Sequence, residues 1–310
     1  MKEYLINCTV QRDFHLLAFS ISADLQLLLF IGILVMYLLT VLGNLIITGL
    51  IYVTPQLHTP MYYFLCNLSV QDIVYVSSVL PKFLFILVTN DTRIVFPACI
   101  TQMFFFTFCV VAEYLLLTFM AYDRYVAICI PLRYTTIMNK DLCITLFSVS
   151  WIAGFFTSLT YAKLVSTLSF CNSQDISKLY CDLKTMIALS SGDITDIEVL
   201  FFVECIFLGL TPIVLILASY TCIIATVIKI RSSVGRVKAF SSCSSHLTVV
   251  LLFCGTSLSS YMVPELEQSP ELDKYLSLLY TVVAPMLNPL VYSLRNKQVL
   301  RAVGNVLKKY

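Results

Sequence analysis

Residues 25–53 read LQLLLFIGILVMYLLTVLGNLIITGLIYV, and Asn44 is the main polar interruption of this run. A helix that crosses a bilayer needs about 20 mostly apolar residues, so the run is long enough for one crossing. The rest of the chain is similar: of 310 residues, 59% are hydrophobic and 12% are charged, and the mean hydropathy is +0.88. Soluble domains carry about 25% charged residues. The composition therefore argues against a cytosolic enzyme, a disordered chain or, with a net charge of only +2, a nucleic-acid binder.

Six further apolar runs follow the first. The predicted spans are 25–53, 60–85, 99–130, 142–162, 197–228, 240–263 and 272–294. The runs are long and continuously apolar, whereas strands of an outer-membrane barrel are about 10 residues long and alternate. The predicted fold class is therefore an all-α membrane protein, a seven-transmembrane helix bundle that forms a single domain over residues 1–310. Residues 1–24 are polar and lack the apolar core of a cleavable signal peptide, so the first span is expected to act as the insertion signal.

The charges divide unequally between the two sides of the membrane. If the C-terminus lies inside, the inner segments hold 12 basic and two acidic residues, and the outer segments hold eight basic and 14 acidic residues. Cytoplasmic loops are enriched in Lys and Arg. This asymmetry predicts an extracellular N-terminal segment, residues 1–24, and a cytoplasmic tail, residues 295–310. The sequon at Asn7 then lies outside, as glycosylation requires.

Four of the 12 cysteines are predicted on the outer side: Cys8, Cys99, Cys171 and Cys181. Disulfides persist in that environment. Four cysteines allow three pairings, and their spacing alone does not choose among them. No group of His, Cys, Asp or Glu shows metal-ligand spacing, and no nucleophile–base pair or phosphate loop suggests an enzyme.

Six motifs occur in order along the chain. They are Gly43-Asn44, Pro60-Met-Tyr-Tyr-Phe-Leu65 with Asp72, Met120-Ala-Tyr-Asp123-Arg124-Tyr125-Val-Ala-Ile-Cys129, Ser219-Tyr220, Lys238-Ala-Phe-Ser-Ser-Cys-Ser-Ser-His246, and Pro285-Met-Leu-Asn288-Pro289-Leu-Val-Tyr292. Together they resemble the tetrapod-type olfactory (odorant) receptors, within the rhodopsin-like G-protein-coupled receptors. The resemblance covers essentially the whole chain.

The resemblance implies a plasma-membrane receptor that is not an enzyme and needs no cofactor. It implies that a small volatile hydrophobic odorant binds in the upper helix bundle. A stimulatory olfactory G protein is then activated and cyclic AMP rises. Two alternatives are a non-olfactory rhodopsin-like receptor and a small-solute transporter. A transporter should show paired half-repeats or matching broken spans, and the sequence shows none.

Two acidic residues, Asp72 and Glu113, lie deep inside predicted spans. Charged groups in the hydrocarbon are costly and usually functional. With Asn44 and Asn288 they can form a polar core in mid-membrane. By resemblance, a sodium ion or a shared proton is expected there, favouring the resting state; the alternative is a structural hydrogen-bond network.

The inner half of the bundle is expected to hold the switch for G-protein coupling. Asp123 is expected to hold Arg124 in the resting state, and Asn288-Pro289 is expected to interrupt the seventh span. Tyr292 and Tyr220 can meet when the bundle opens, and His246 lies at a moving helix end. The full set of expected switch residues is Asp123, Arg124, Tyr125, Tyr220, His246, Cys254, Asn288, Pro289 and Tyr292.

The upper bundle is expected to form a mostly apolar ligand pocket with few polar anchors. One face of the third span and parts of three other spans are the candidates. They are Met103, Phe106, Thr107, Val110, Val111, Phe202, Phe207, Ser257, Tyr261, Leu278 and Thr281. Glu204 is a further candidate on the fifth span.

The resemblance also implies a disulfide between Cys99 and Cys181. The family usually has a second pair in the long outer loop, but the expected partner of Cys171 is Ser191 here. Cys171 is therefore predicted to be free, or paired with an unusual partner such as Cys8. In the sixth span, Cys254 replaces a family tyrosine thought to sense the ligand. After the seventh span, apolar residues at helical spacing beside basic ones predict a short amphipathic helix on the inner membrane surface.

Overall fold

The computed structural model describes residues 13–17, 21–171, 174–262, 270–294 and 297–307. Side chains are not described at 238, 241–242, 258–262, 270–273, 292–294, 297–298 and 305–307. Each predicted span falls on a helix or on helices that follow one another directly. These are α2 (Ala23–Val53), α3 (Pro60–Thr89), α4 (Phe96–Cys129), α6 (Lys140–Ser166), α8 (Thr195–Glu204) with η3 (Cys205–Leu210) and α9 (Thr211–Lys229), α10 (Ser233–Met262), and α11 (Pro270–Leu278) with η4 (Leu279–Val283) and α12 (Ala284–Leu294). The all-α bundle is thereby confirmed.

The outer surface of this bundle is apolar. Leu28, Ile46 and Leu217 are each more than 60% exposed, which would be unfavourable in water. Among the described residues, five helical segments are long and apolar enough to cross a membrane, and Cys243–Ser257 in α10 is a shorter apolar stretch. The chain is therefore a multi-pass membrane protein.

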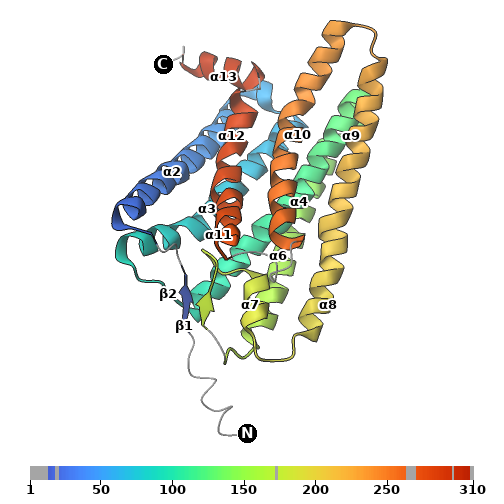
Figure 1. The fold of residues 1–310 in the computed structure, drawn as a ribbon. Coiled ribbons are helices and arrows are strands. Elements are labelled where there is room, and N and C mark those ends of the chain that lie inside the picture. Colours follow the sequence, from blue (N-terminus) through green and yellow to red (C-terminus); the bar gives the residue numbers. More distant parts are fainter. Residues whose placement is uncertain (1–12, 18–20, 172–173, 263–269, 295–296, 308–310) are drawn as a thin grey trace.

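One end of the bundle carries a small sheet that the sequence analysis did not predict. Its strands are β1 (Asp13–Leu16), β2 (Arg93–Val95) and β3 (Asp175–Ile176), in the order β2-β1-β3. The central strand β1 pairs antiparallel with β2 (Phe14 opposite Ile94) and parallel with β3 (His15 opposite Asp175). Three segments distant in sequence are thus joined by backbone hydrogen bonds. We call this end, with helix α7 (Leu183–Leu189), the sheet end (Figure 1).

The opposite end carries helix α13 (Lys297–Leu307), and we call it the tail end (Figure 1). It also holds η1 (Pro55–Leu57), η2 (Pro131–Arg133) and α5 (Tyr134–Ile137). Val299 and Ala302 on α13 are buried against the bundle, and Leu300 and Arg301 are exposed. The predicted short amphipathic helix is therefore present.

Close helix contacts depend on two glycines. A Cβ added at Gly154 on α6 would lie 2.7 Å from the Phe108 carbonyl oxygen of α4, and one at Gly43 on α2 would lie 3.2 Å from Pro289 of α12. Small residues allow membrane helices to approach closely. The Gly43-Asn44 motif therefore has a packing role. Without a side chain, Gly43 leaves room for the ring of Pro289, which belongs to the motif in the last span.

Irregular turns occur in the fifth and seventh helical segments. The π-helical segment η3 ends at Leu210, just before Thr211 and Pro212, and the Thr211 hydroxyl donates to the Ile206 carbonyl at 2.9 Å. In the last segment, however, α12 continues through Pro289, and the irregular turns are in η4. A proline can be accommodated in a membrane helix when local adjustments satisfy the backbone. The helix therefore continues through Asn288-Pro289, and the kink expected there stays a prediction.

Candidate functional site

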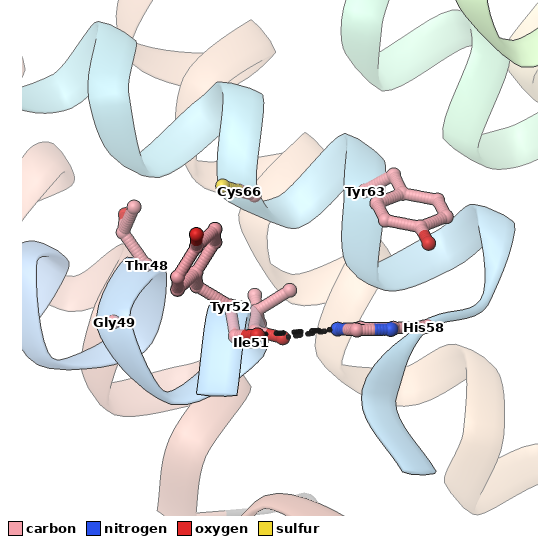
Figure 2. Close-up of a pocket in the computed structure, with 7 residues that line it drawn as sticks. All are labelled: Thr48, Gly49, Ile51, Tyr52, His58, Tyr63 and Cys66. Carbon is pink, nitrogen blue, oxygen red and sulfur yellow. Dashed lines mark hydrogen bonds between the residues drawn. The ribbon is translucent and has the colours of Figure 1, made fainter. Parts of the chain in front are cut away.

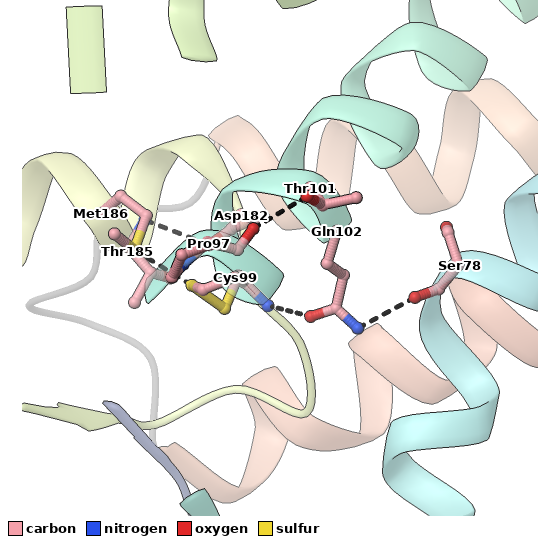
Figure 3. The surroundings of a disulfide bond; sticks show 9 residues. Ser78, Pro97, Cys99, Thr101, Gln102, Asp182, Thr185 and Met186 are labelled. Carbon is pink, nitrogen blue, oxygen red and sulfur yellow. Dashed lines mark hydrogen bonds between the residues drawn. A yellow bond between two sulfur atoms is a disulfide. The ribbon is translucent and has the colours of Figure 1, made fainter. Parts of the chain in front are cut away.

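A disulfide fixes the long loop to the sheet end of α4. Cys99 and Cys181 are bonded, with Cα atoms 5.4 Å apart, as the resemblance implied (Figure 3). The neighbouring Gln102 bridges three segments: its amide nitrogen donates to the Ser78 carbonyl of α3 at 3.0 Å, and its amide oxygen accepts from the Cys181 N–H at 2.9 Å. The loop is therefore held to α4 by a covalent bond and by the buried Gln102 amide oxygen, and the amide nitrogen joins the same side chain to α3.

Next to this disulfide the loop enters the bundle. Leu179 and Tyr180 are almost completely buried. The centroids of the Tyr180 ring and the Phe106 ring of α4 lie 4.7 Å apart. The centroids of the Phe106 and Tyr280 rings lie 6.0 Å apart, and those of Tyr280 in η4 and Phe253 in α10 lie 5.9 Å apart. These rings, with Tyr114, form what we call the aromatic chain, which runs from the loop to the middle of the bundle.

The aromatic chain ends at a polar contact that the sequence analysis missed. The Tyr114 ring lies 4.8 Å from Phe253, and its hydroxyl oxygen lies 2.7 Å from the Ser257 hydroxyl oxygen. This hydrogen bond joins α4 to α10. A tyrosine in an apolar run is a detectable signal, but only the structure shows what its hydroxyl reaches.

Most of the predicted ligand residues face the interior. Met103, Phe106, Ser257 and Thr281 are no more than 2% exposed and Val111 is 8% exposed, while Thr107, Val110 and Leu278 are half-buried. The Tyr261 side chain lies outside the described ones.

Two predicted ligand residues require a correction. Phe202 and Phe207 are each 66% exposed, so they point away from the bundle interior. The outer face of a membrane helix is as apolar as its inner face, and composition therefore could not indicate which face turns inward. Glu204, on the same segment, is half-buried and interacts with Tyr161 and Thr157 of α6.

The predicted polar core is assembled from four helices. Asn288 of α12 donates to both Asp72 carboxylate oxygens, at 3.2 and 3.1 Å, and also interacts with Glu113 of α4. Asn44 of α2 interacts with Asp72 as well. All four side chains are at most 7% exposed, so Asn288 lies between two buried carboxyl groups.

Gln71 completes this core and was not predicted. Its amide nitrogen donates to the Cys109 carbonyl at 2.6 Å and to the Glu113 carboxylate at 3.3 Å. Its amide oxygen is buried and has no hydrogen-bond partner among the described residues. The core therefore contains one buried acceptor that remains available.

At the tail end Asp123 bonds two neighbours. Arg124 forms an ion pair with it and donates from Nε to Oδ2 at 2.9 Å. The Tyr134 hydroxyl of α5 donates to Oδ1 at 2.8 Å. Burial and the nearby Asp123 carboxylate raise the pKa of Tyr134, so the phenol stays protonated and can donate. Asp123 is fully buried, and Tyr134 is a partner that the sequence analysis missed.

A second tail-end contact joins three helices. The Tyr220 hydroxyl of α9 lies 2.7 Å from His246 Nδ1 of α10, and His246 Nε2 lies 3.1 Å from the Leu117 carbonyl oxygen of α4. The imidazole is completely buried and stacks on the Tyr220 ring. Tyr220 therefore binds His246 in this structure; the predicted partner Tyr292 has no described side chain. Tyr125 is half-buried beside Tyr122.

The loop cysteine Cys171 is disulfide-bonded. The prediction that it is a free thiol is therefore wrong. Its backbone N–H donates to the Ser191 hydroxyl at 3.2 Å, so the residue at the family's usual partner position does lie beside it. Cys8, the alternative partner, and the sequon residue Asn7 lie outside the described residues. Cys254 is a half-buried free thiol.

A surface hollow of about 520 Å³ lies between α2 and α3 near η1 (Figure 2). It is lined by Thr48, Gly49, Ile51, Tyr52, His58, Tyr63 and Cys66. The His58 ring bonds to the Ile51 carbonyl at 3.0 Å. None of the predicted ligand residues lines this hollow.

Comparisons with known proteins agree with these observations. A family model described as olfactory receptor matches residues 33–309. Similar proteins include olfactory receptor 6J1 from Homo sapiens, 45% identical over 294 residues that cover 95% of this chain and 85% of the relative. Olfactory receptor 1G1 from Gorilla gorilla gorilla is 44% identical, covering 97% and 96% of the two chains. Olfactory receptor 5AR1 from Mus musculus is 42% identical, covering 98% of each chain.

Proposed function

The chain belongs to the olfactory receptor family, and from this premise we propose how it binds an odorant and passes the signal on. It is an odorant receptor and not an enzyme. The proposed ligand is a small, volatile, mostly apolar molecule. Its proposed site lies between α4, α10 and the last helical segment, near Phe106, Ser257 and Thr281. The aromatic chain supports this site most directly, because it joins the buried loop residues to α10.

We propose that the loop covers this site. Tyr180 packs on Phe106, and the disulfide and Gln102 hold the adjoining residue Cys181 in place. A ligand beneath the loop displaces or reorients rings that touch one another through Tyr280 and Phe253. Aromatic rings in a packed interior transmit such changes because the core has little free volume.

The proposed receptor is a single domain with seven spans, an extracellular N-terminus and a cytoplasmic C-terminus. The positive charges of the tail-end segments support this orientation. In it, the sheet end faces outward, and Asp123, Arg124 and Tyr125 face the cytoplasm. When the tail end of α10 moves away from α4, Arg124 becomes available to a heterotrimeric G protein of the stimulatory olfactory type, and cyclic AMP rises.

We propose that Asp72 and Glu113 share a sodium ion or a proton in the resting state. Two nearby carboxylates repel each other unless a positive charge lies between them. Carboxylate and amide oxygens are suitable ligands for a hard cation, and the buried Gln71 oxygen supplies one more acceptor. If sodium is bound, replacing sodium by a bulky cation at constant ionic strength should raise agonist potency, and Asp72→Asn should abolish this effect. Equal potency in both salts would favour a purely structural network.

The overall proposal is tested with epitope-tagged receptor in cells that carry an olfactory G protein and a cyclic AMP reporter. A panel of volatile odorants should produce a concentration-dependent signal in the wild type. Arg124→Ala should abolish this signal while surface staining stays normal, because the side chain proposed to contact the G protein is lost. Cys222→Ser, at an exposed free thiol on α9, is the control. A full response in Arg124→Ala would overturn the coupling role.

A further inference from the structure

The hydroxyl groups of Tyr114 and Ser257 form an isolated pair inside the bundle. Their oxygens are 2.7 Å apart, and the residues are 8% and 2% exposed. The Phe253 ring lies 4.8 Å from the Tyr114 ring, and Tyr280 follows behind Phe253. Two hydroxyls are thus enclosed by rings at the point where α4 meets α10.

The two hydroxyl groups have more donor hydrogens than the hydrogen bond between them requires. Two hydroxyl groups carry two donor hydrogens, and the bond between them uses one. Among the residues that the structure describes, neither hydroxyl has another hydrogen-bond partner. One O–H therefore remains without an acceptor, and a buried donor without an acceptor is unfavourable.

Two buried threonine hydroxyls nearby are satisfied within their own helices. Thr118 on α4 donates to the Tyr114 carbonyl at 2.7 Å, and Thr281 on η4 donates to the Ser277 carbonyl at 2.6 Å. Each uses the carbonyl four residues earlier in its own helix. These two hydroxyls therefore have no hydrogen left to offer a ligand, unlike the Tyr114–Ser257 pair.

The surroundings indicate what kind of acceptor fits. Cys254 lies one turn before Ser257 on α10, so a small thiol occupies the position beside the pair. The pair offers hydroxyl donors and no cationic side chain, so an anion would have no counter-charge here. The remaining neighbours are aromatic. A neutral molecule that combines an apolar body with one oxygen acceptor matches both features.

We propose that the Tyr114–Ser257 pair is the polar anchor of the ligand site, and that it selects neutral odorants with an acceptor oxygen, such as ketones, aldehydes and alcohols, over hydrocarbons. The ligand oxygen accepts the unused hydrogen. In addition it competes for the hydrogen bond that joins α4 to α10, so binding weakens the contact between the two helices. This second effect rests on the proposed function; the selection of oxygenated ligands does not depend on G-protein coupling.

The test uses the purified full-length receptor in lipid nanodiscs, with straight-chain ketones and the alkanes of the same length as probes. The ligand-induced rise in Tm reports binding without a G protein. The ketone should bind the wild type more tightly than the matched alkane. The double variant Tyr114→Phe/Ser257→Ala removes both hydroxyls, since either one alone would keep a free donor hydrogen. It should lower ketone affinity about two- to tenfold, the value of one hydrogen bond, and leave alkane affinity nearly unchanged.

Thr118→Val is the matched control, because it removes a buried hydroxyl that is already satisfied within α4. It should keep the preference for the ketone. The proposal is overturned if ketone and alkane bind the wild type equally, if neither raises the Tm, or if the double variant keeps the full preference. If the preference behaves as expected but no cyclic AMP signal occurs in cells, the anchor stands and the coupling proposal fails.

Discussion

The two ends of the bundle are held together by different kinds of bonds. At the sheet end, a disulfide, three paired strands and the Gln102 amide connect the loops to α4. At the tail end, an ion pair and hydrogen bonds made by side chains join the helices: Asp123 bonds to Arg124 and Tyr134, and His246 connects α9 with α4. Covalent and backbone links persist, whereas ion pairs and side-chain hydrogen bonds can exchange partners. The comparison indicates a fixed ligand-binding end and a switchable response end.

The largest effect is expected from breaking the sheet end. Cys181→Ser removes the Cys99 disulfide, and loss of a native disulfide costs about 2–5 kcal/mol. It also leaves the Cys99 thiol of α4 buried and without its disulfide partner. Surface staining of tagged receptor should fall almost to background. Cys222→Ser, at an exposed free thiol, should be normal. A normal surface level for Cys181→Ser would show that the strands alone fix this end.

A smaller effect of a different kind is expected at the tail end. Asp123→Asn removes the charge that holds Arg124, and hydrogen bonds to charged groups are worth about 1.5–3 kcal/mol. The receptor should reach the surface, and its basal cyclic AMP should rise because the resting contact is weakened. Basal signalling at the wild-type level, with normal staining, would contradict the resting role of this ion pair.

Tyr134→Phe distinguishes the contribution of Tyr134 from that of Arg124, the other partner of Asp123. It removes one hydrogen bond, worth about 1 kcal/mol, and keeps the Arg124 ion pair. Basal cyclic AMP should therefore rise less than in Asp123→Asn. An equal or larger rise would mean that Tyr134, rather than Arg124, is the main restraint on the resting state.

Cys254→Tyr tests the role of the middle of α10, which lies between the sheet end and the tail end. The added ring would enter space beside Tyr114 and Phe253, and overpacking a filled interior costs about 1–3 kcal/mol. Basal signal and odorant response should both change, and Cys254→Ser should change neither strongly. No change in either measurement for Cys254→Tyr would argue against a switch role for this position.

Disulfide mapping sharpens the description of the sheet end without altering the chain. Among the residues that the structure describes, eight cysteines are free thiols, Cys99 pairs with Cys181, and Cys171 is disulfide-bonded. Of the 12 cysteines in the sequence, Cys8 is the one that remains. Non-reducing peptide mapping should therefore link Cys171 to Cys8. Recovery of Cys171 as a mixed disulfide with a small thiol would refute this pairing.

The helices were predictable because long apolar runs leave few alternatives in a membrane. The Asp123–Arg124 pair and the grouping of Asp72, Glu113, Asn44 and Asn288 followed from motifs and from the cost of buried charge. Other features required the structure. The orientation of Phe202 and Phe207 could not be predicted from the sequence, because both faces of their helical segment are apolar.

The sheet was missed for a different reason. Strand β1 is four residues long and pairs with segments far away in sequence, so no local pattern marks it. Tyr134 and Tyr114 were missed because their importance lies in a partner on another helix. In physical terms, what the sequence encodes locally was recoverable, and what depends on long-range pairing was not.

The central claim is that an odorant opens the tail end and leaves the sheet end fixed. It is tested most directly by pulsed electron spin resonance on receptor in nanodiscs, with spin labels on non-canonical amino acids. One pair replaces the exposed residues Leu132 and Val234 at the tail end, and the other replaces Leu17 and Val95 at the sheet end. An activating odorant should lengthen the Leu132–Val234 distance and leave the Leu17–Val95 distance unchanged. An unchanged tail-end distance, or equal changes at both ends, would contradict the account.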